Sequence, residues 1–266
     1  MLTKSHGLGN DYLVADPADL PFSVTPERVR LLCDRHIGAG SDGLLLLDGQ
    51  TGVRIFNPDG SEAEKSGNGL RIFARWLYDT GRVDSQRFTL HTLAGDAAVE
   101  VQGRLVTVEM GIPQFRDDVS SLEIDGDRLN VVVLSIGNPH CVILRDQLDV
   151  LDLRRIGPLV ERHPAFPNRT NVQLARAVDR RRVELLIWER GAGETRASGS
   201  SACAVVAAGR RLGLVDGHTD VTASMPGGEL RIRIDQGGSV WMTGPVEEVA
   251  HITLSPDLIA RLQALP

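Results

Sequence analysis

Two serines lie at positions where the sequence predicts an anion-binding site. Ser66 and Ser198 occupy the same place in two similar segments, 53–84 and 184–216, which are offset by 132 residues. Each serine precedes a glycine and then apolar residues at helical spacing, so each is predicted to be the N-cap of a helix. A helix start presents unpaired N–H groups and the positive end of the helix dipole, which together bind anions. The sequence therefore predicts two related carboxylate-binding positions.

Such a pair of helix starts suits proton transfer at a carbon next to a carboxylate. The binding N–H groups would be those of Gly67, Asn68, Gly199 and Ser200. If the two starts share one carboxylate, the serines flank the bound molecule on opposite faces, as a racemase or epimerase requires. The helix dipoles would also stabilise negative charge as the proton leaves Cα. The chain shows no P-loop, no G-x-G-x-x-G after a strand and no pyridoxal-phosphate lysine context, so we expect a reaction without a cofactor.

An internal duplication explains the two matching segments. Without a gap, the offset of 132 pairs identical residues at the predicted cap, at the glycine predicted to end each helix and at the entry to the next strand. Strands are predicted at 53–56 and 183–188, and alternating runs after each helix predict antiparallel hairpins. The paired identities are Ile55/Ile187, Glu62/Glu194, Ser66/Ser198, Gly67/Gly199, Gly81/Gly213, Val83/Val215, Asp84/Asp216 and Gly95/Gly227.

The duplication predicts an α+β protein of two homologous mixed domains, related by a pseudo-two-fold axis, with a ligand cleft between them. We expect an N-terminal domain at 1–118, a C-terminal domain at 119–250, and a last segment at 251–266 that packs back on the N-terminal domain. A length of 266 residues is enough for two such cores.

Composition narrows the class of protein further. The net charge of −6 disfavours nucleic acid as a partner, so a small molecule is the expected ligand. Cys33, Cys141 and Cys203 are widely spaced, without a C-x-x-C pair, which predicts a reducing cytoplasmic setting and no metal site. No apolar run is long enough to cross a membrane. The pattern is also compatible with a homodimer.

Long blocks of the sequence resemble the diaminopimelate epimerase family. They run in the family's order from residue 1 to about 245 and are specific to it. They are HGLGNDY (6–12), RHIGAGSDGLLL (35–46), RIFNPDGSEAEKSGNGLRIFAR (54–75), SIGNPHCV (135–142), FPNRTNV (166–172), ERGAGETRASGSSACA (189–204) and MPGGEL (225–230).

The resemblance implies LL- to meso-diaminopimelate epimerisation in lysine biosynthesis, by two-base 1,1-proton transfer without a cofactor. It also implies a substrate-binding set, to which the helix starts contribute Gly67, Asn68, Gly199 and Ser200. Turns and strand ends would supply the others, which contact the carboxylates and amines at the two ends of the substrate: Asn10, Asn57, Asn138, His140, Asn171, Glu189 and Arg190.

The sequence departs from the family at the two residues that matter most for catalysis. The family's bases are cysteines at the cap positions, where this chain has Ser66 and Ser198. A thiol with a pKa of about 8.5 supplies thiolate far more readily than a serine hydroxyl supplies alkoxide, so serine should slow proton exchange by orders of magnitude.

Three accounts of the serines remain open at the level of sequence. The chain could be an active enzyme altered at both cysteines, a related isomerase of another small acid, or a binding protein that has lost its chemistry. Lys65 and Ser201 depart from the family as well, which disfavours the first account. A different base could come from a charged residue near the caps, and the candidates are Glu62, Glu64, Lys65 and Glu194.

Overall fold

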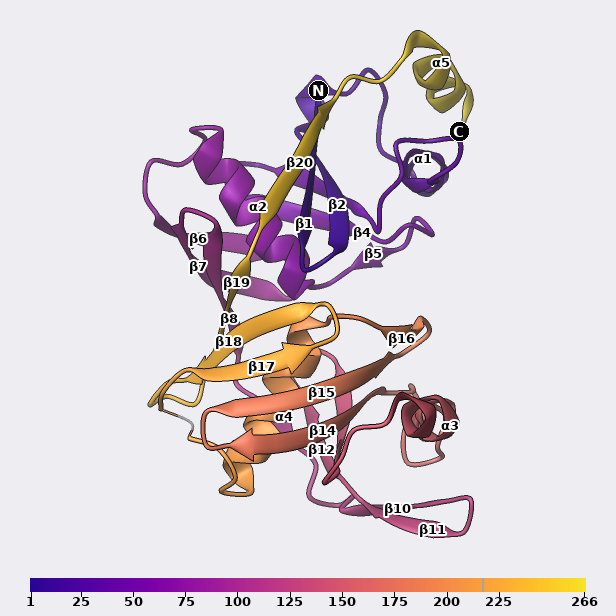
Figure 1. The fold of residues 1–266 in the computed structure, drawn as a ribbon. Coiled ribbons are helices and arrows are strands. Elements are labelled where there is room, and N and C mark those ends of the chain that lie inside the picture. Colours follow the sequence, from indigo (N-terminus) through magenta and orange to yellow (C-terminus); the bar gives the residue numbers. More distant parts are fainter. Residues whose placement is uncertain (217) are drawn as a thin grey trace. The chain divides into compact units, whose positions relative to one another are not determined.

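The computed structural model describes residues 1–216 and 218–266, and it divides into two compact units (Figure 1). Unit 1 comprises Met1–Val108 and Gly244–Pro266, and unit 2 comprises Glu109–Thr243. The boundaries fall within two strands, β8 (Leu105–Gly111) and β19 (Val240–Pro245), and each strand is assigned to the unit that holds most of its residues. No helix in the described part of the chain is long and apolar enough to cross a bilayer.

Unit 1 combines a mixed sheet with one central helix and two peripheral helices. Its elements, in chain order, are β1 (Leu2–Gly7), β2 (Asn10–Ala15), the 3-10 helix η1 (Pro17–Asp19), α1 (Pro26–Cys33), β3 (Leu44–Asp48), β4 (Gly52–Phe56), β5 (Glu62–Ala63), α2 (Gly67–Asp79), β6 (Arg87–Thr92), β7 (Gly95–Gln102), β8 (Leu105–Gly111), β20 (Glu247–Ile252) and α5 (Pro256–Ala264).

Unit 2 repeats this order and adds the small hairpin β10–β11. Its elements are β9 (Gln114–Phe115), β10 (Ser121–Ile124), β11 (Asp127–Asn130), β12 (Val132–Ser135), β13 (Pro139–Leu144), α3 (Val150–Glu161), β14 (Asn171–Asp179), β15 (Arg182–Glu189), β16 (Gly193–Thr195), α4 (Gly199–Arg211), β17 (Val221–Met225), β18 (Gly228–Ile234) and β19 (Val240–Pro245).

Strand pairing confirms the duplication. β1 and β2 are antiparallel, β2 and β3 parallel, and β3 and β4 antiparallel. The same succession recurs in β12 to β15. After the helix, β6 pairs in parallel with β4, as β17 does with β15. The predicted strands at 53–56 and 183–188 therefore occupy equivalent places in two similar folds.

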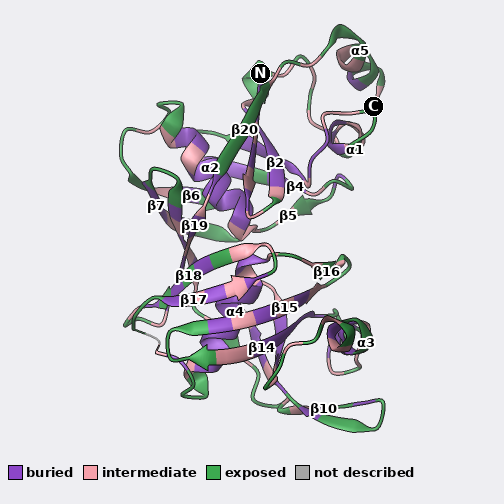
Figure 2. Cartoon of the chain, in the orientation of Figure 1, coloured by how far each residue is buried: buried purple, intermediate pink, exposed green. Residues whose placement is uncertain are grey.

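Helices α2 and α4 begin and end at equivalent residues because local signals fix both ends. Ser66 and Ser198 are the N-cap residues, as predicted, but only the Ser66 side chain bonds to the first turn of its helix. Gly81 and Gly213 follow the C-caps with φ of 67° and 71°. This left-handed conformation suits glycine, and it lets the next N–H groups bond back to the last carbonyls of the helix. Both helices are buried over most of their length (Figure 2).

The edges of the units differ from the predicted boundaries at 118 and 250. Residues 109–118 belong to unit 2, where β9 pairs antiparallel with β12. Residues 244–250 belong to unit 1, where β20 pairs with β1. The last strand of the first repeat, β9, therefore pairs with the first strand of the second repeat, β12, and the last strand of the second repeat, β20, pairs with β1. The amino-acid composition does not reveal such pairings.

The C-terminal helix packs on unit 1. Leu262 is fully buried in an apolar cluster with Leu2, Val29 and Leu32. Arg28 adds polar contacts, since its guanidinium donates to the carbonyls of Leu262 and Leu265 at 2.8 and 2.6 Å. This helix therefore completes the core of unit 1 beside α1.

We expect Leu262→Ala to lower the free energy of unfolding by about 2–5 kcal/mol, because it leaves a cavity in this cluster. The control is Leu151→Ala, at a leucine that is 66% exposed, which should change stability by less than about 1 kcal/mol. Urea unfolding followed by circular dichroism measures both. Equal effects of the two variants would contradict a structural role for α5.

Candidate functional site

The first helix start holds its serine between a backbone donor and a phenol. Ser66 Oγ accepts a hydrogen bond from the N–H of Gly69 at 3.1 Å, which satisfies one N–H of the first turn of α2. The same oxygen lies 3.1 Å from the hydroxyl of Tyr12, which reaches it from β2. The Ser66 hydroxyl therefore has a hydrogen-bond partner that can give or accept a proton.

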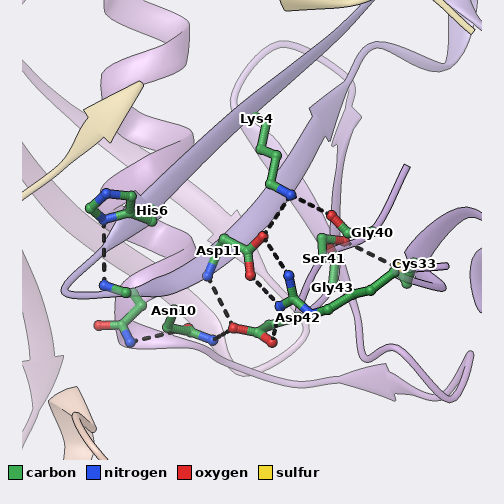
Figure 3. Close-up of polar contacts among 12 residues, drawn as sticks. Lys4, His6, Asn10, Asp11, Cys33, Gly40, Ser41, Asp42 and Gly43 are labelled. Carbon is green, nitrogen blue, oxygen red and sulfur yellow. Dashed lines mark hydrogen bonds and ion pairs between the residues drawn. The ribbon is translucent and has the colours of Figure 1, made fainter. Parts of the chain in front are cut away.

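Two predicted substrate contacts of unit 1 are joined directly. Asn68, in the first turn of α2, donates through Nδ2 to Oδ1 of Asn10 at 3.1 Å. Asn10 in turn donates to Oδ2 of Asp42 at 3.0 Å (Figure 3). The turn between β1 and β2 thus lies against the start of α2. The third predicted contact, Asn57, lies after β4 and directs its Nδ2 to the hydroxyl of Ser61 at 3.0 Å.

The second helix start gives its serine a different neighbour. Ser198 is only 8% exposed and makes no side-chain bond to the first turn of α4. Its hydroxyl instead interacts with the carboxyl group of Glu189, at the end of β15. Burial raises the pKa of Glu189, and the hydroxyls of Ser198 and Thr195 offset only part of that effect. A carboxyl with a raised pKa beside a hydroxyl is a candidate general base.

His140 is buried and neutral. Burial lowers its pKa from 6.5 to about 3, and the positive charge of Arg190 acts in the same direction. Its Nδ1 lies 3.0 Å from the amide nitrogen of Gln173, which can only donate, so the ring proton belongs on Nε2. Nε2 then donates to Oδ1 of Asn138 at 2.8 Å. His140 is therefore placed to orient Asn138 rather than to carry charge.

The remaining predicted residues of unit 2 lie around the same strand ends. Asn138 donates to the hydroxyl of Ser200 at 3.4 Å, so the β12–β13 turn reaches the start of α4. Asn171 donates to the carbonyl of Pro139 at 2.9 Å and accepts the backbone N–H of Arg190 at 3.0 Å. Buried Glu161 holds the following turn through the N–H of Gly191.

The two helix starts are alike in backbone and unlike in side chains. At the offset of 132, Glu189 corresponds to Asn57, so a carboxyl group stands at this place in unit 2 and an amide in unit 1. In unit 1 the side chain that contacts Ser66 is Tyr12, which lies on β2. The arrangement can therefore supply a base beside one serine and a proton donor beside the other.

Two of the four alternative bases suggested by the sequence are engaged in ion pairs, and the cysteine thiols are disfavoured as bases. Glu62 pairs with Arg54 and Glu194 with Arg154, and both pairs lie at the surface. Cys33, Cys141 and Cys203 are all buried. Burial raises the pKa of the Cys33 and Cys141 thiols, which disfavours their thiolate forms. In the described part of the chain, no group of three or more His, Cys, Asp or Glu side chains is placed to hold a metal ion.

The sequence did not predict several residues that contact the site. Tyr12 lies two residues after Asn10 on a strand, so the period of 2 places both on one face, and this signal could have identified it. Longer-range residues gave no local signal, because their partners are far away along the chain. These are Asp42, Glu161 and Gln173. Arg71 bonds Asn68 only three residues away on α2 and was missed as well.

A model of the diaminopimelate epimerase family matches residues 2–116 and 132–249. The chain belongs to this family. It is 45% identical to diaminopimelate epimerase 2 of Nostoc sp., over 97% of this chain and 96% of that protein. It is 41% identical to the diaminopimelate epimerase of Pelotomaculum thermopropionicum, over 93% of this chain and 96% of that protein.

Solved structures of other activities share the fold of this family member. A hydroxyproline epimerase from Agrobacterium vitis superposes with a TM-score of 0.69 at 16% identity, covering 94% of this chain and 90% of that one. A phenazine biosynthesis protein from Bacillus anthracis gives the same TM-score and identity, covering 94% and 97%. At these identities the likeness shows the fold alone.

The state of His140 yields a prediction by NMR. We expect its imidazole to stay neutral, with the proton on Nε2, from pH 8 down to about 5, because its pKa lies near 3. In the unfolded chain the ring should titrate near its ordinary value of about 6.5. Below that pH the unfolded state binds one more proton, so this residue lowers stability as the pH falls from about 6.5 towards 3.

Ring ¹⁵N shifts of the folded and urea-unfolded protein measure both states. A midpoint above pH 5 in the folded protein would contradict the buried neutral ring.

Proposed function

We propose that this chain interconverts LL- and meso-diaminopimelate by proton removal and return at Cα, without a cofactor. Family membership at 45% and 41% identity to diaminopimelate epimerases supports the substrate. The observation that carries the reaction type is the pair of serine-capped helix starts at equivalent places in the two repeats. The mechanism requires one proton-transfer group on each face of Cα, and each unit supplies one candidate.

Carbanion character at Cα is stabilised through the substrate carboxylate. The first-turn N–H groups of α2 and α4, at Gly67, Asn68, Gly199 and Ser200, lack intrahelical acceptors and donate to anions. As the Cα–H bond breaks, charge moves onto the carboxylate oxygens, where these donors and the helix dipoles act most strongly. The helix starts therefore stabilise the transition state, in which the carboxylate carries extra negative charge, more than they stabilise the bound substrate.

Glu189 provides the base on one face. In this proposal Ser198 Oγ takes the proton from Cα while the hydroxyl proton passes to the Glu189 carboxylate, so no free alkoxide forms. The net change is one proton moved from carbon to carboxylate. Burial, which raises the pKa of Glu189, makes it a stronger acceptor than an exposed glutamate.

Ser66 delivers a proton on the other face. Its hydroxyl hydrogen passes to Cα, and the Tyr12 hydroxyl at 3.1 Å returns a hydrogen to Ser66 Oγ. Solvent then restores Tyr12 and removes the proton from Glu189, which completes the cycle. For the opposite substrate isomer the same groups act in reverse. Asn10, Asn57, Asn138, Asn171 and Arg190 are assigned to the binding and orientation of the polar ends of the substrate. Buried His140 acts through Asn138.

The central test replaces both serines by cysteine. Serine is the weaker acid, so we expect Ser66→Cys/Ser198→Cys to exchange the Cα proton of LL-diaminopimelate at least roughly 10²-fold faster than the chain with both serines. Proton NMR in D2O measures the loss of the Cα–H signal. The single variants, each with one thiol, serve as controls and should fall between the two.

The outcomes separate the alternatives. No exchange and no binding in either protein would contradict the diaminopimelate assignment. Binding without exchange in the serine form, together with exchange in the cysteine form, would mean a preserved pocket with disabled bases. Equal exchange in both proteins would show that the serine hydroxyls do not limit the reaction.

A pH profile tests Glu189. Because burial raises its pKa above 4.5, exchange should fall as the pH decreases, with the acidic limb above 4.5. Glu189→Gln should abolish this limb and lower the rate by roughly 10²-fold or more. Glu194→Gln is the matched control, since that glutamate pairs with Arg154 at the surface, and its profile should stay unchanged. An unchanged limb in Glu189→Gln would contradict the role of Glu189.

A further inference from the structure

A chain of four side chains in unit 1 runs from a buried guanidinium to a carboxylate. Arg71 Nη2 donates to Oδ1 of Asn68 at 2.8 Å. Asn68 Nδ2 donates to Oδ1 of Asn10 at 3.1 Å, and Asn10 Nδ2 donates to Oδ2 of Asp42 at 3.0 Å. The two amides in the middle are the predicted substrate contacts, and the two charged groups at the ends have had no role so far.

The charged ends determine which way each amide points. A guanidinium can only donate, so the atom of Asn68 that faces Arg71 must be its oxygen. An ionised carboxylate can only accept, so the atom of Asn10 that faces Asp42 must be its nitrogen. The middle contact, from Asn68 nitrogen to Asn10 oxygen, agrees with both. Reversal of either amide would place two donors or two acceptors against each other.

The surroundings hold the carboxylate end in place. Asp42 accepts hydrogen bonds from Arg35 at 2.7 Å and from the backbone N–H of Asp11 at 3.1 Å. Arg35 also bonds Asp11 at 2.6 Å, and Lys4 lies 3.0 Å from the other oxygen of Asp11 (Figure 3). Burial alone would raise the pKa of Asp11, but hydrogen bonds from Arg35 and Lys4 outweigh it, so its pKa is lowered. This cluster keeps Asp42 beside Asn10.

The guanidinium end is fixed by packing. The Arg71 side chain is fully buried. A Cβ at Gly7 would lie 2.8 Å from Arg71 Nη2, so the backbone of β1 passes close to the guanidinium only because residue 7 is glycine. The α2 carbonyl of Gly67 accepts a further, longer contact from Nη1 at 3.4 Å.

Unit 2 lacks this arrangement at the equivalent place. There Asn138 contacts the Ser200 hydroxyl and the His140 ring. The Ser200 hydroxyl can donate or accept, and the His140 ring, whose proton is placed on Nε2 by the amide of Gln173, is neutral. The direction of Asn138 is therefore set without a charged group. At the offset of 132, Cys203 stands where unit 1 has Arg71. The charged ends are therefore a property of unit 1.

We propose that Asp42 and Arg71 are positioning residues that lock the amide orientations of Asn10 and Asn68. The ligand then always meets one fixed pattern of N–H and C=O groups, and no ordering cost is incurred on binding. The lock itself follows from the contacts of unit 1, whereas its use in substrate binding rests on the proposed function.

The direct test is NMR on the isotopically labelled natural protein. Couplings across the hydrogen bonds should join Asn10 Nδ2 to the carboxyl carbon of Asp42 and Asn68 Nδ2 to the side-chain carbonyl carbon of Asn10. These measurements need no variant to fold. Couplings that join the amides in the reverse sense, or rapid rotation of either amide, would overturn the lock.

Asp42→Asn tests the role of the charge, because it keeps the shape and removes the acceptor-only end. We expect Asn10 amide hydrogen exchange to rise roughly tenfold or more and KM for diaminopimelate to rise roughly tenfold, with kcat changed by less than about threefold. Asp96→Asn is the matched control, because it makes the same change at an exposed aspartate of unit 1 that pairs with His91 and lies outside this cluster. Both properties should stay near those of the natural protein.

The results distinguish the lock from the function. Loss of amide protection in Asp42→Asn without a rise in KM would overturn the positioning role. Equal changes in Asp42→Asn and Asp96→Asn would show that the effect is not specific to the acceptor that faces Asn10, and would also overturn the proposal. A natural protein that neither binds nor exchanges diaminopimelate, yet shows the couplings, would refute the proposed function and support the lock.

Discussion

Unpaired N–H groups at the starts of α2 and α4 are the constraint around which the rest of the structure is arranged. A helix start buried in a protein must find acceptors for its first-turn donors. Ser66 satisfies one of them, at Gly69, and the donors that remain are available to an anion. Because the strands before each helix and the glycines after it occupy equivalent places, the two repeats present these donors in the same way.

The two repeats have similar backbone folds, but different side chains surround their helix starts. Tyr12 stands beside Ser66, and Glu189 beside Ser198. Epimerisation removes a proton on one side of a carbon and returns one on the other side. At any moment one group must accept a proton while the other donates one, so different neighbours beside the two serines suit this reaction. In the proposed mechanism, the groups beside the two serines carry the charge that a hydroxyl carries poorly, and proton transfer would continue on that basis.

What could be predicted from the sequence depended on how local the determining contacts are. The cap bond of Ser66 and the helix ends at Gly81 and Gly213 depend on interactions within a few residues, so the sequence predicts them. Ser198 is also an N-cap, but it makes no side-chain bond to its helix, which the sequence did not indicate. The contact between Tyr12 and Ser66 spans 54 residues and that between Asn10 and Asp42 spans 32, so only strand register brings these groups together. The family resemblance identified Asn10 and Asn68 as site residues, but it did not indicate that Asp42 and Arg71 contact them.

The crossing of the terminal strands has a consequence for the ancestry of the chain. β9, at the end of the first repeat, completes the sheet of the second, and β20, at the end of the second repeat, completes the sheet of the first. A single ancestral repeat folding alone would have left an open sheet edge, which favours pairing with another chain. Two copies exchanging their last strands would have closed both edges at once. Fusion of such a strand-swapped, symmetric pair would give one polypeptide whose two halves are free to acquire different side chains.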